Sequence, residues 1–308
     1  MEQRTLGSSG PPLSVIGLGC NNFGMRVDEA GTAAVVHAAL DAGITHFDTA
    51  EMYGGGKSEE FLGAALGNRR DEVVIATKFL PRPKGEPYVP GKLAARINEA
   101  VEGSLRRLGT DRIDLYYQHY PDLEAPVEEA LVTLTALVQA GKVVHLASSN
   151  VSAEQIHEAV KTSESQSLAS FTGTQIHWSL LARDVEASVV PAATDVGLGV
   201  VPFFPLASGM LTGKYRRDEP FPENSRMIAF GEQFAQRFAT DENFAKVDAY
   251  SAYAEQHGHS VTELATGWLL SQPSVTSVIT GATKPEQVTL NVRPWILTAA
   301  EAAEVANL

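Results

Sequence analysis

Residues 73–78 read Val-Val-Ile-Ala-Thr-Lys and residues 113–119 read Ile-Asp-Leu-Tyr-Tyr-Gln-His, with a long amphipathic stretch at 92–108 between them. The two short runs are almost continuously apolar, which is typical of parallel strands buried on both faces. Gly109 stands where the intervening helix should stop. This segment therefore predicts a strand, a helix and a second strand, the repeating unit of an α/β fold.

The same alternation runs through the rest of the chain. Short apolar runs predict strands at Ser14–Leu18, Ile44–Phe47, Val73–Thr77, Ile113–Tyr117, Val143–Ala147, Phe171–Gln175, Gly199–Pro202 and Val275–Ile279. The stretches between them predict helices at Asp28–Ala42, Ser58–Leu66, Lys92–Leu108, Val127–Gln139, Ala153–Val160 and Asp184–Thr194. Eight strand–helix units without a break in composition favour a closed (β/α)8 TIM barrel, forming a single domain over residues 1–308. A doubly wound open sheet is the main rival, but it usually needs fewer strands per domain.

Three features depart from this alternation. Arg4 to Val15 has the pattern of a β-hairpin, which we expect to cap the bottom of the barrel. Tyr215–Asn243, after the seventh strand, is a long irregular insertion, and loops of that length commonly bind ligands or cover a site. Further helices are expected at Phe244–His257, Val261–Ser271 and Ala299–Val305.

Composition narrows the possible functions. The 308 residues carry 24 Lys and Arg against 37 Asp and Glu, a net charge of −13, which argues against nucleic acid or an anionic membrane as the main partner. Cys20 is the only cysteine, so an intrachain disulfide and a cysteine-based zinc site are excluded. The start, Met1-Glu-Gln-Arg4, is polar and no apolar run approaches the ~20 residues of a membrane span, so we expect a cytoplasmic protein.

Polar and ionisable side chains follow nearly every predicted strand. Asp48 follows the second strand with Tyr53 shortly after it, Lys78 follows the third strand, and His119 follows the fourth. In a (β/α)8 barrel the active site lies at the carboxyl ends of the strands. Each residue alone has an ordinary structural interpretation, such as a surface lysine or a hydrogen-bonded core histidine.

Together, the four residue types suit the reduction of a carbonyl group. A tyrosine hydroxyl, with a reference pKa near ~10, is a poor proton donor at neutral pH. A nearby ammonium lowers that pKa, and a carboxylate paired with the lysine keeps the ammonium in place. A histidine beside the tyrosine can hold a carbonyl oxygen in line. The aspartate, tyrosine, lysine and histidine together therefore predict general-acid catalysis.

Longer motifs resemble the aldo-keto reductase superfamily, in order along essentially the whole chain. They are His46-Phe-Asp-Thr-Ala-Glu-Met-Tyr-Gly54 with Ser58-Glu-Glu and Leu62-Gly63, Ile75-Ala-Thr-Lys-Phe79, Asp114-Leu-Tyr-Tyr-Gln-His119, Ser149-Asn150, Gln175, Pro205-Leu206, Leu211-Thr-Gly-Lys214, and Gly281 through Gln287 to Asn291. The Leu-Thr-Gly-Lys segment and the insertion after it are most similar to the bacterial and potassium-channel-β-like branch. The resemblance implies a TIM-barrel oxidoreductase that reduces aldehydes or ketones to alcohols by hydride transfer from NADPH.

The resemblance also implies a role for each matching position. Tyr53 would be the general acid, Asp48 and Lys78 would tune it, and His119 would orient the substrate carbonyl. The cofactor would lie against Asp48, Ser149, Asn150, Gln175, Phe203, Phe204, Pro205, Leu206, Ser208, Gly209, Leu211, Lys214, Gly281, Thr283, Lys284, Gln287 and Asn291. Walls of the pocket for a small-molecule carbonyl substrate would come from Asn21, Asn22, Tyr120, Trp178 and parts of the insertion.

Several cofactor positions depart from the family pattern. Phe203 stands where relatives usually carry Tyr, Phe204 where Ser is common, and Leu290 where Glu often contacts adenine. Lys284 is the predicted partner of the 2′-phosphate of NADPH, as a single point charge that would allow some use of NADH. An exposed lysine at a helix start is the alternative interpretation of Lys284.

Two other functions stay open at this point. A binding protein on the same scaffold, like the potassium channel β subunits, would use the cofactor as a redox sensor. A metal-dependent barrel hydrolase would want a His-x-His at a strand end with carboxylate ligands. His46-Phe-Asp48 is the nearest approach and lacks partners, so we expect no metal. The oligomeric state is left open.

Two smaller features complete the prediction. Gly54-Gly-Gly-Lys57-Ser58 resembles the end of a phosphate-binding loop, but Glu51 stands where that loop needs its first glycine. We expect instead a glycine turn in which Ser58 caps the next helix. Cys20 either lines the pocket or is an inert buried thiol.

Overall fold

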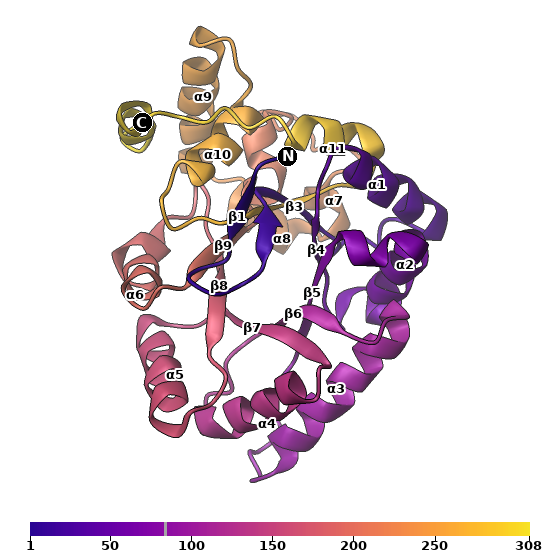
Figure 1. Cartoon of the computed structure of the whole chain (residues 1–308). Helices are drawn as coiled ribbons and strands as arrows, with labels where there is room; N and C mark the ends of the chain where they lie inside the picture. The colour runs from indigo at the N-terminus through magenta and orange to yellow at the C-terminus, as the bar shows by residue number, and fades with distance from the viewer. Residues whose placement is uncertain (83–84) are drawn as a thin grey trace.

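The structure, a computed structural model, describes residues 1–82 and 85–308 and is a (β/α)8 barrel, as predicted (Figure 1). Its eight-stranded parallel sheet has the spatial order β10, β3, β4, β5, β6, β7, β8, β9. The strands are β3 (Ile16–Gly19), β4 (His46–Asp48), β5 (Val74–Phe79), β6 (Ile113–Gln118), β7 (Val143–Ser149), β8 (Phe171–His177), β9 (Gly199–Phe203) and β10 (Val278–Gly281). Each predicted strand is present, with its ends shifted by up to three residues.

The ring closes between β9 and the residues just before β10. The Val200 amide donates to the Ser274 carbonyl over 2.9 Å, and the Thr276 amide donates to the Val200 carbonyl over 2.9 Å. These bonds occupy backbone groups that an open sheet would leave unpaired at its edge. The closure excludes the doubly wound alternative.

Helices form the outer ring around the strands (Figure 1). They are α1 (Glu29–Asp41), α2 (Lys57–Leu66), α3 (Lys92–Leu108), α4 (Val127–Gln139), α5 (Ala153–Gln166), α6 (Val189–Asp195), α9 (Asp241–Gln256), α10 (Val261–Leu270), α11 (Pro285–Asn291) and α12 (Ala299–Val305). Local capping explains many of their ends. The Asp28 carboxylate accepts from the Gly31 amide, and Gly109 ends α3 in the left-handed conformation with φ of 63°.

The predicted amino-terminal hairpin is present and closes the amino end of the barrel. Strands β1 (Gln3–Thr5) and β2 (Pro12–Ser14) pair antiparallel. Leu6 and Leu13 are fully buried in one cluster with interior side chains of β5, β6, β7, β9 and β10. A Cβ on Gly199 would lie 2.7 Å from Leu6 Cδ1, so a glycine at the start of β9 makes room for the hairpin.

Two predicted elements need correction. The insertion Tyr215–Asn243 is not wholly irregular, because it contains α7 (Arg226–Ala229) and α8 (Glu232–Phe238), whose buried apolar side chains pack against the core. The predicted helix Asp184–Thr194 is two pieces, a 3₁₀ turn at Asp184–Ala187 followed by α6. Ser188 between them has φ of −144°, which is not helical.

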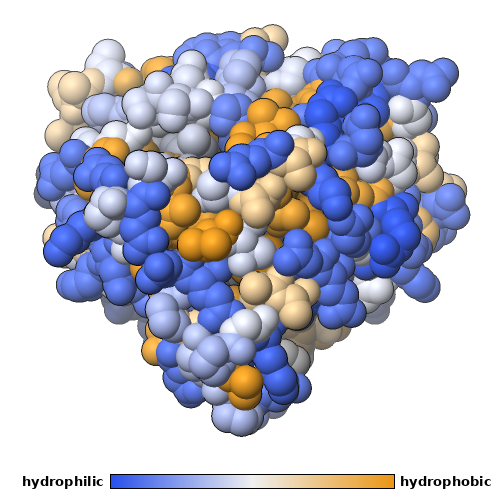
Figure 2. All heavy atoms as spheres, turned by 60° about the horizontal axis from the view of Figure 1, so that its bottom comes forward, coloured by the Kyte–Doolittle hydropathy of each residue, from blue (hydrophilic) through white to orange (hydrophobic). Residues whose placement is uncertain are grey.

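Figure 2 shows one face, where hydrophilic side chains cover most of the surface and hydrophobic ones gather near the middle. Within residues 1–82 and 85–308, no helix combines the length and the apolar character that crossing a bilayer requires.

Candidate active site

A cavity of about 680 Å³ lies at the carboxyl ends of the barrel strands. Asp48, Tyr53 and His119 line it, and the fully buried Lys78 lies against Asp48. The same cavity collects most of the predicted cofactor residues, namely Ser149, Asn150, Gln175, Phe203, Phe204, Pro205, Leu206, Ser208, Gly209, Lys214, Gly281, Thr283, Gln287 and Asn291. Of the predicted pocket walls, Asn21, Asn22 and Tyr120 also face it.

Asp48 and Lys78 form a buried ion pair. Lys78 Nζ lies 2.5 Å from Asp48 Oδ1 and donates to the Thr49 carbonyl over 2.8 Å. Burial alone lowers the pKa of Lys78, but Asp48 and Tyr53 outweigh it and raise the pKa above its ordinary value. Lys78 is therefore a permanent ammonium at the base of the cavity.

Tyr53 lies directly against this ammonium. Lys78 Nζ is 5.1 Å from the centroid of the Tyr53 ring, and the Tyr53 and His119 rings meet edge to face at 5.9 Å. Burial raises the pKa of the Tyr53 hydroxyl, Lys78 acts to lower it and Asp48 to raise it, so the pKa stays above its ordinary value. The phenol is thus protonated at neutral pH, and Lys78 opposes the effect of burial.

His119 is a neutral imidazole. Burial, with a smaller effect of Lys78, lowers the pKa of His119 to about 3. Within the described part of the chain, its Nδ1 is buried and has no hydrogen-bond partner. The ring stacks on Tyr120 at a centroid distance of 4.9 Å. A neutral ring in this position can donate a hydrogen bond from one nitrogen without bringing a second positive charge beside Lys78.

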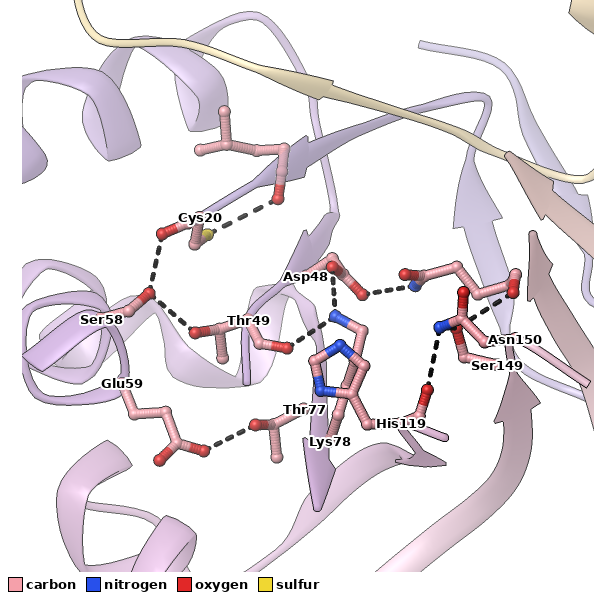
Figure 3. A network of polar contacts seen from close by, with 12 residues as sticks. Cys20, Asp48, Thr49, Ser58, Glu59, Thr77, Lys78, His119, Ser149 and Asn150 are labelled. Atoms are coloured by element: carbon pink, nitrogen blue, oxygen red, sulfur yellow. Dashed lines mark hydrogen bonds and ion pairs between the residues drawn. The ribbon is translucent and has the colours of Figure 1, made fainter. Parts of the chain in front are cut away.

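The first turn of α2 adjoins the site, and Figure 3 shows Ser58 beside Thr49 and Glu59 beside Thr77. Ser58 does not cap α2 as expected: Gly56 occupies the N-cap position, and Ser58 lies inside the helix. Its hydroxyl lies 2.8 Å from Thr49 Oγ1 and donates to the Cys20 carbonyl over 2.8 Å. The cap prediction is wrong because α2 begins at Lys57, two residues earlier than a helix capped by Ser58 would begin.

One side of the cavity is built of polar groups that hold one another. The Asn150 amide donates to the His119 carbonyl over 2.9 Å and to Ser149 Oγ over 3.0 Å, and the Ser149 hydroxyl donates to the Gln175 carbonyl over 3.0 Å. Phe203 lines the cavity beside them and stacks on His177 at 5.5 Å. A flat aromatic face and a row of amides therefore adjoin the acid–base cluster.

The loop after β9 has an unusual backbone. Phe204, Ala207, Ser208 and Gly209 all have positive φ, at 53°, 44°, 59° and 98°. Three of them are not glycine, and such residues persist at positive φ only when the surroundings determine the conformation. Ser208 Oγ is buried and has no hydrogen-bond partner among the described residues. An unpaired buried hydroxyl in the wall of a cavity is free to bond a ligand there.

Two cations in the cavity, Arg26 and Arg226, are not among the residues predicted from the sequence. Arg226 donates to Asn21 Oδ1 over 3.2 Å, and Arg26 donates to the Asn224 carbonyl over 2.6 Å. Burial, then Arg26 and Arg226, lower the pKa of Lys214, so the three cations repel one another. The insertion was predicted to bind ligands, but only the folded chain shows that α7 brings Arg226 across to the β3 side of the barrel.

Besides the buried Lys78, three predicted site residues lie outside the cavity lining. Trp178 needs correction as a pocket wall: it is 2% exposed, donates through Nε1 to Glu186, and packs edge to face on Trp268. Leu211 is fully buried in the core, and Lys284 is an exposed residue at the start of α11. Strand-end position alone did not reveal which way these side chains point.

Cys20 fits both interpretations made from the sequence. It lines the cavity and is fully buried, and burial raises the pKa of its thiol well above the ordinary value. Among the residues that the structure describes, no group of three or more His, Cys, Asp or Glu side chains is arranged to hold a metal ion.

In a comparison with known protein families, residues 15–308 match the model of the aldo/keto reductase family. A protein of Oryza sativa named "Probable voltage-gated potassium channel subunit beta" is 36% identical over 299 residues, covering 95% of this chain and 90% of that protein. A Bacillus subtilis protein named "Uncharacterized oxidoreductase YrpG" is 34% identical over 299 residues, covering 94% of this chain and 89% of that protein.

Proposed function

Because this chain belongs to the aldo/keto reductase family, we propose that it is an NADPH-dependent oxidoreductase that reduces aldehydes or ketones to alcohols. The observation that carries the proposal is the contact of Tyr53 with the buried Lys78–Asp48 pair, beside the neutral His119. These four groups meet at the base of a cavity large enough for a cofactor and a small substrate.

Tyr53 is the proposed general acid. Its hydroxyl stays protonated at neutral pH, which a proton donor must be before it acts. The negative charge that develops on its oxygen as the proton leaves is stabilised by the Lys78 ammonium, whose own position is set by Asp48. Lys78 therefore favours the transition state more than the ground state, which is the requirement for catalysis.

His119 is proposed to orient the carbonyl oxygen. Because its pKa is lowered to about 3, it is neutral throughout the physiological range and donates a hydrogen bond without competing as an acid. Its edge-to-face contact with Tyr53 places both groups on the same part of the cavity wall. A carbonyl oxygen that contacts both would be held in line for protonation.

The residues present fit a nicotinamide dinucleotide. NADPH, when bound, supplies the hydride. Gln175, Ser149 and Asn150 present the amide and hydroxyl groups that suit a carboxamide, and Phe203 offers a face for an aromatic ring. The unpaired Ser208 hydroxyl lies on the loop of positive φ values, where a pyrophosphate would supply the missing acceptor.

Three positively charged side chains in the cavity favour an anionic ligand with two or three phosphate groups. Arg26, Lys214 and Arg226 line one cavity. Burial first, and then the charge of Arg26, lowers the pKa of both Lys214 and Arg226, so an anion in the cavity would stabilise their charged forms. Arg226 lies beside Gly281, since its Nη2 is 4.0 Å from where a Cβ of Gly281 would stand. Gly281 begins the segment proposed for the adenosine ribose, so Arg226 is a better candidate than Lys284 for the 2′-phosphate of NADPH.

The alternative is a cofactor-binding redox sensor on the same scaffold, and turnover separates the two. The test is a panel of aldehydes and ketones with NADPH consumption as the measurement, run in parallel on wild type and Tyr53→Phe. Reduction by the wild type that the variant largely loses would support the proposal. Tight NADPH binding with no carbonyl reduced faster by the wild type than by the variant would favour the sensor.

A further inference from the structure

Tyr53 stands on a loop that ends in three consecutive glycines. The loop leaves β4 at Thr49 and enters α2 at Lys57, and its last three residues are Gly54, Gly55 and Gly56 with φ of 59°, 65° and 96°. Glycine reaches these angles without steric cost but also leaves them easily. Besides the bond from the Tyr53 amide to the Ala50 carbonyl, the position of the phenol therefore depends on the contacts that hold the two ends of the loop.

The ends of this loop are tied by hydroxyl groups. Ser58 donates its single hydroxyl proton to the Cys20 carbonyl, so the 2.8 Å contact between Ser58 and Thr49 must use the Thr49 hydroxyl as donor. All three residues are fully buried. The carbonyl of Thr49 accepts from Lys78 Nζ over 2.8 Å, so the residue that closes the loop also holds the ammonium.

Glu59 ties the same helix turn to the strand that carries Lys78. Its Oε1 accepts from the hydroxyl of Thr77 over 2.6 Å, and its Oε2 accepts from Arg107 Nε over 2.6 Å (Figure 3 shows the Thr77 contact). Thr77 directly precedes Lys78 on β5. A Cβ on Gly56 would lie 2.8 Å from Arg107 Cδ, so the arginine stem packs against the glycine turn as well.

We propose that Ser58 and Glu59 are positioning residues, which set the distance between Tyr53 and Lys78 by joining the Tyr53 loop to β4, β3 and β5. Neither side chain lines the cavity, so both act through the acid–base pair. The inference rests on the proposed function for its catalytic consequence, whereas the restraint on the loop is independent of it. Each buried bond has a specific geometry, and leaving one partner unpaired carries the full desolvation cost.

The first test compares Ser58→Ala with Ser163→Ala. Ser163 is also a buried helical serine whose hydroxyl donates to a backbone carbonyl, that of Ala169, but it lies in α5 and outside the cavity lining. We expect amide hydrogen exchange of residues 49–58 in the ligand-free protein to quicken about tenfold in Ser58→Ala, the factor for one lost bond of about 1.4 kcal/mol. Ser163→Ala should leave that segment unchanged.

The same pair is then compared in the carbonyl reduction assay. Ser58→Ala should lower kcat about tenfold, raise the pH at which activity falls on the alkaline side, and leave the Kd for NADPH within about twofold. The alkaline shift follows because a looser contact with Lys78 removes the effect that lowers the Tyr53 pKa. A role in stability alone would lower the melting temperature without moving the pH profile.

The second test uses Thr77→Val and Thr77→Ser. The valine variant keeps the shape but removes the donor to Glu59, and the serine variant keeps the hydroxyl. We expect the valine variant to reproduce the pH shift and the faster exchange, and the serine variant to stay close to wild type. This pair retains the buried Glu59–Arg107 contact, so it answers the question if Ser58→Ala fails to fold.

The inference is overturned if Ser58→Ala and Thr77→Val match their controls in exchange and in pH profile. Failure of the proposed function is a different result, namely wild-type protein without turnover, or turnover that Tyr53→Phe retains. In that case the exchange measurement on the ligand-free protein still decides whether Ser58 and Thr77 hold the loop.

Discussion

The amide of Gln175 donates to Asp48 Oδ2 over 2.8 Å, although 127 residues separate them in the chain. Lys78 occupies the other carboxylate oxygen at 2.5 Å. Asp48 thus joins β8 to β5 through the interior of the barrel, and both of its oxygens are used. A buried carboxylate with both oxygens paired has one orientation, so Lys78 beside it has one position relative to Tyr53.

Replacing Tyr53 with phenylalanine should remove most carbonyl reduction. Only the hydroxyl donates the proton, and the ring should still pack against His119 and Lys78. A general acid typically contributes ~10²–10⁴-fold, and we expect a loss of kcat in that range. NADPH affinity, measured by fluorescence quenching, should stay nearly unchanged, and a variant with wild-type turnover would disprove the role of Tyr53.

Replacing Lys78 with methionine should move the pH profile in a defined direction. Lys78 lowers the pKa of Tyr53, so its removal raises that pKa further. Reduction needs the protonated phenol, and the residual activity should therefore persist to higher pH while its maximum falls. A pH profile and rate equal to those of wild type would mean that Lys78 has no influence on the acid.

The same Lys78 variant should also be less stable. Asp48 would keep the Gln175 bond but lose its counter-ion in a buried site. Breaking one side of a buried ion pair costs about 3–5 kcal/mol, which thermal or denaturant unfolding detects. Asp48→Asn combined with Lys78→Met should recover part of the loss, because the uncompensated charge is removed.

Cofactor preference should depend on Arg226 more than on Lys284. The sequence favours Lys284 as the partner of the 2′-phosphate, which predicts that Lys284→Ala weakens NADPH binding and hardly changes NADH binding. Since Arg226 lines the cavity and Lys284 does not, we expect Arg226→Gln to weaken NADPH binding by ~1.5–3 kcal/mol and NADH binding much less. Titration of both cofactors against both variants checks this: a selective loss in Lys284→Ala alone would restore the first assignment.

Folding stability should fall in mild acid because of His46. Burial lowers the pKa of this residue to about 4, and its Nδ1 is 2.9 Å from Ser277 Oγ. The unfolded chain takes up the proton near pH 6.5, so the stability from a neutral His46 is complete above that pH and is lost as pH falls toward 4, by up to roughly 3 kcal/mol. His46→Asn should flatten the dependence of the unfolding free energy on pH over this window. His157→Gln, at an exposed position on α5, is the control that should leave the slope unchanged.

The sequence by itself determined the order of elements and much of the acid–base cluster. The eight strands, and the helices Lys92–Leu108, Val127–Gln139 and Ala299–Val305, follow from local signals: continuous apolar runs, helical periodicity and glycine stops. Asp48, Tyr53, Lys78 and His119 were found because the barrel gathers strand ends at one face, so position along the chain already implies proximity. These are features that depend on a few neighbouring residues or on a repeating rule.

Only the tertiary structure decided the features that depend on distant residues. Arg226 lies on α7 in a segment expected to be irregular, and its approach to Asn21 across 205 positions has no local signal. Trp178 follows a strand, as pocket residues do, but the side chain turns to Trp268 and Glu186 because burial and a bonded indole are available there. Serine is a residue type that often caps helices, yet the Ser58 hydroxyl forms hydrogen bonds with Thr49 and the Cys20 carbonyl instead. In each case the side chain's direction was set by a contact that forms only when the barrel closes, and such contacts are not encoded within any short stretch of chain.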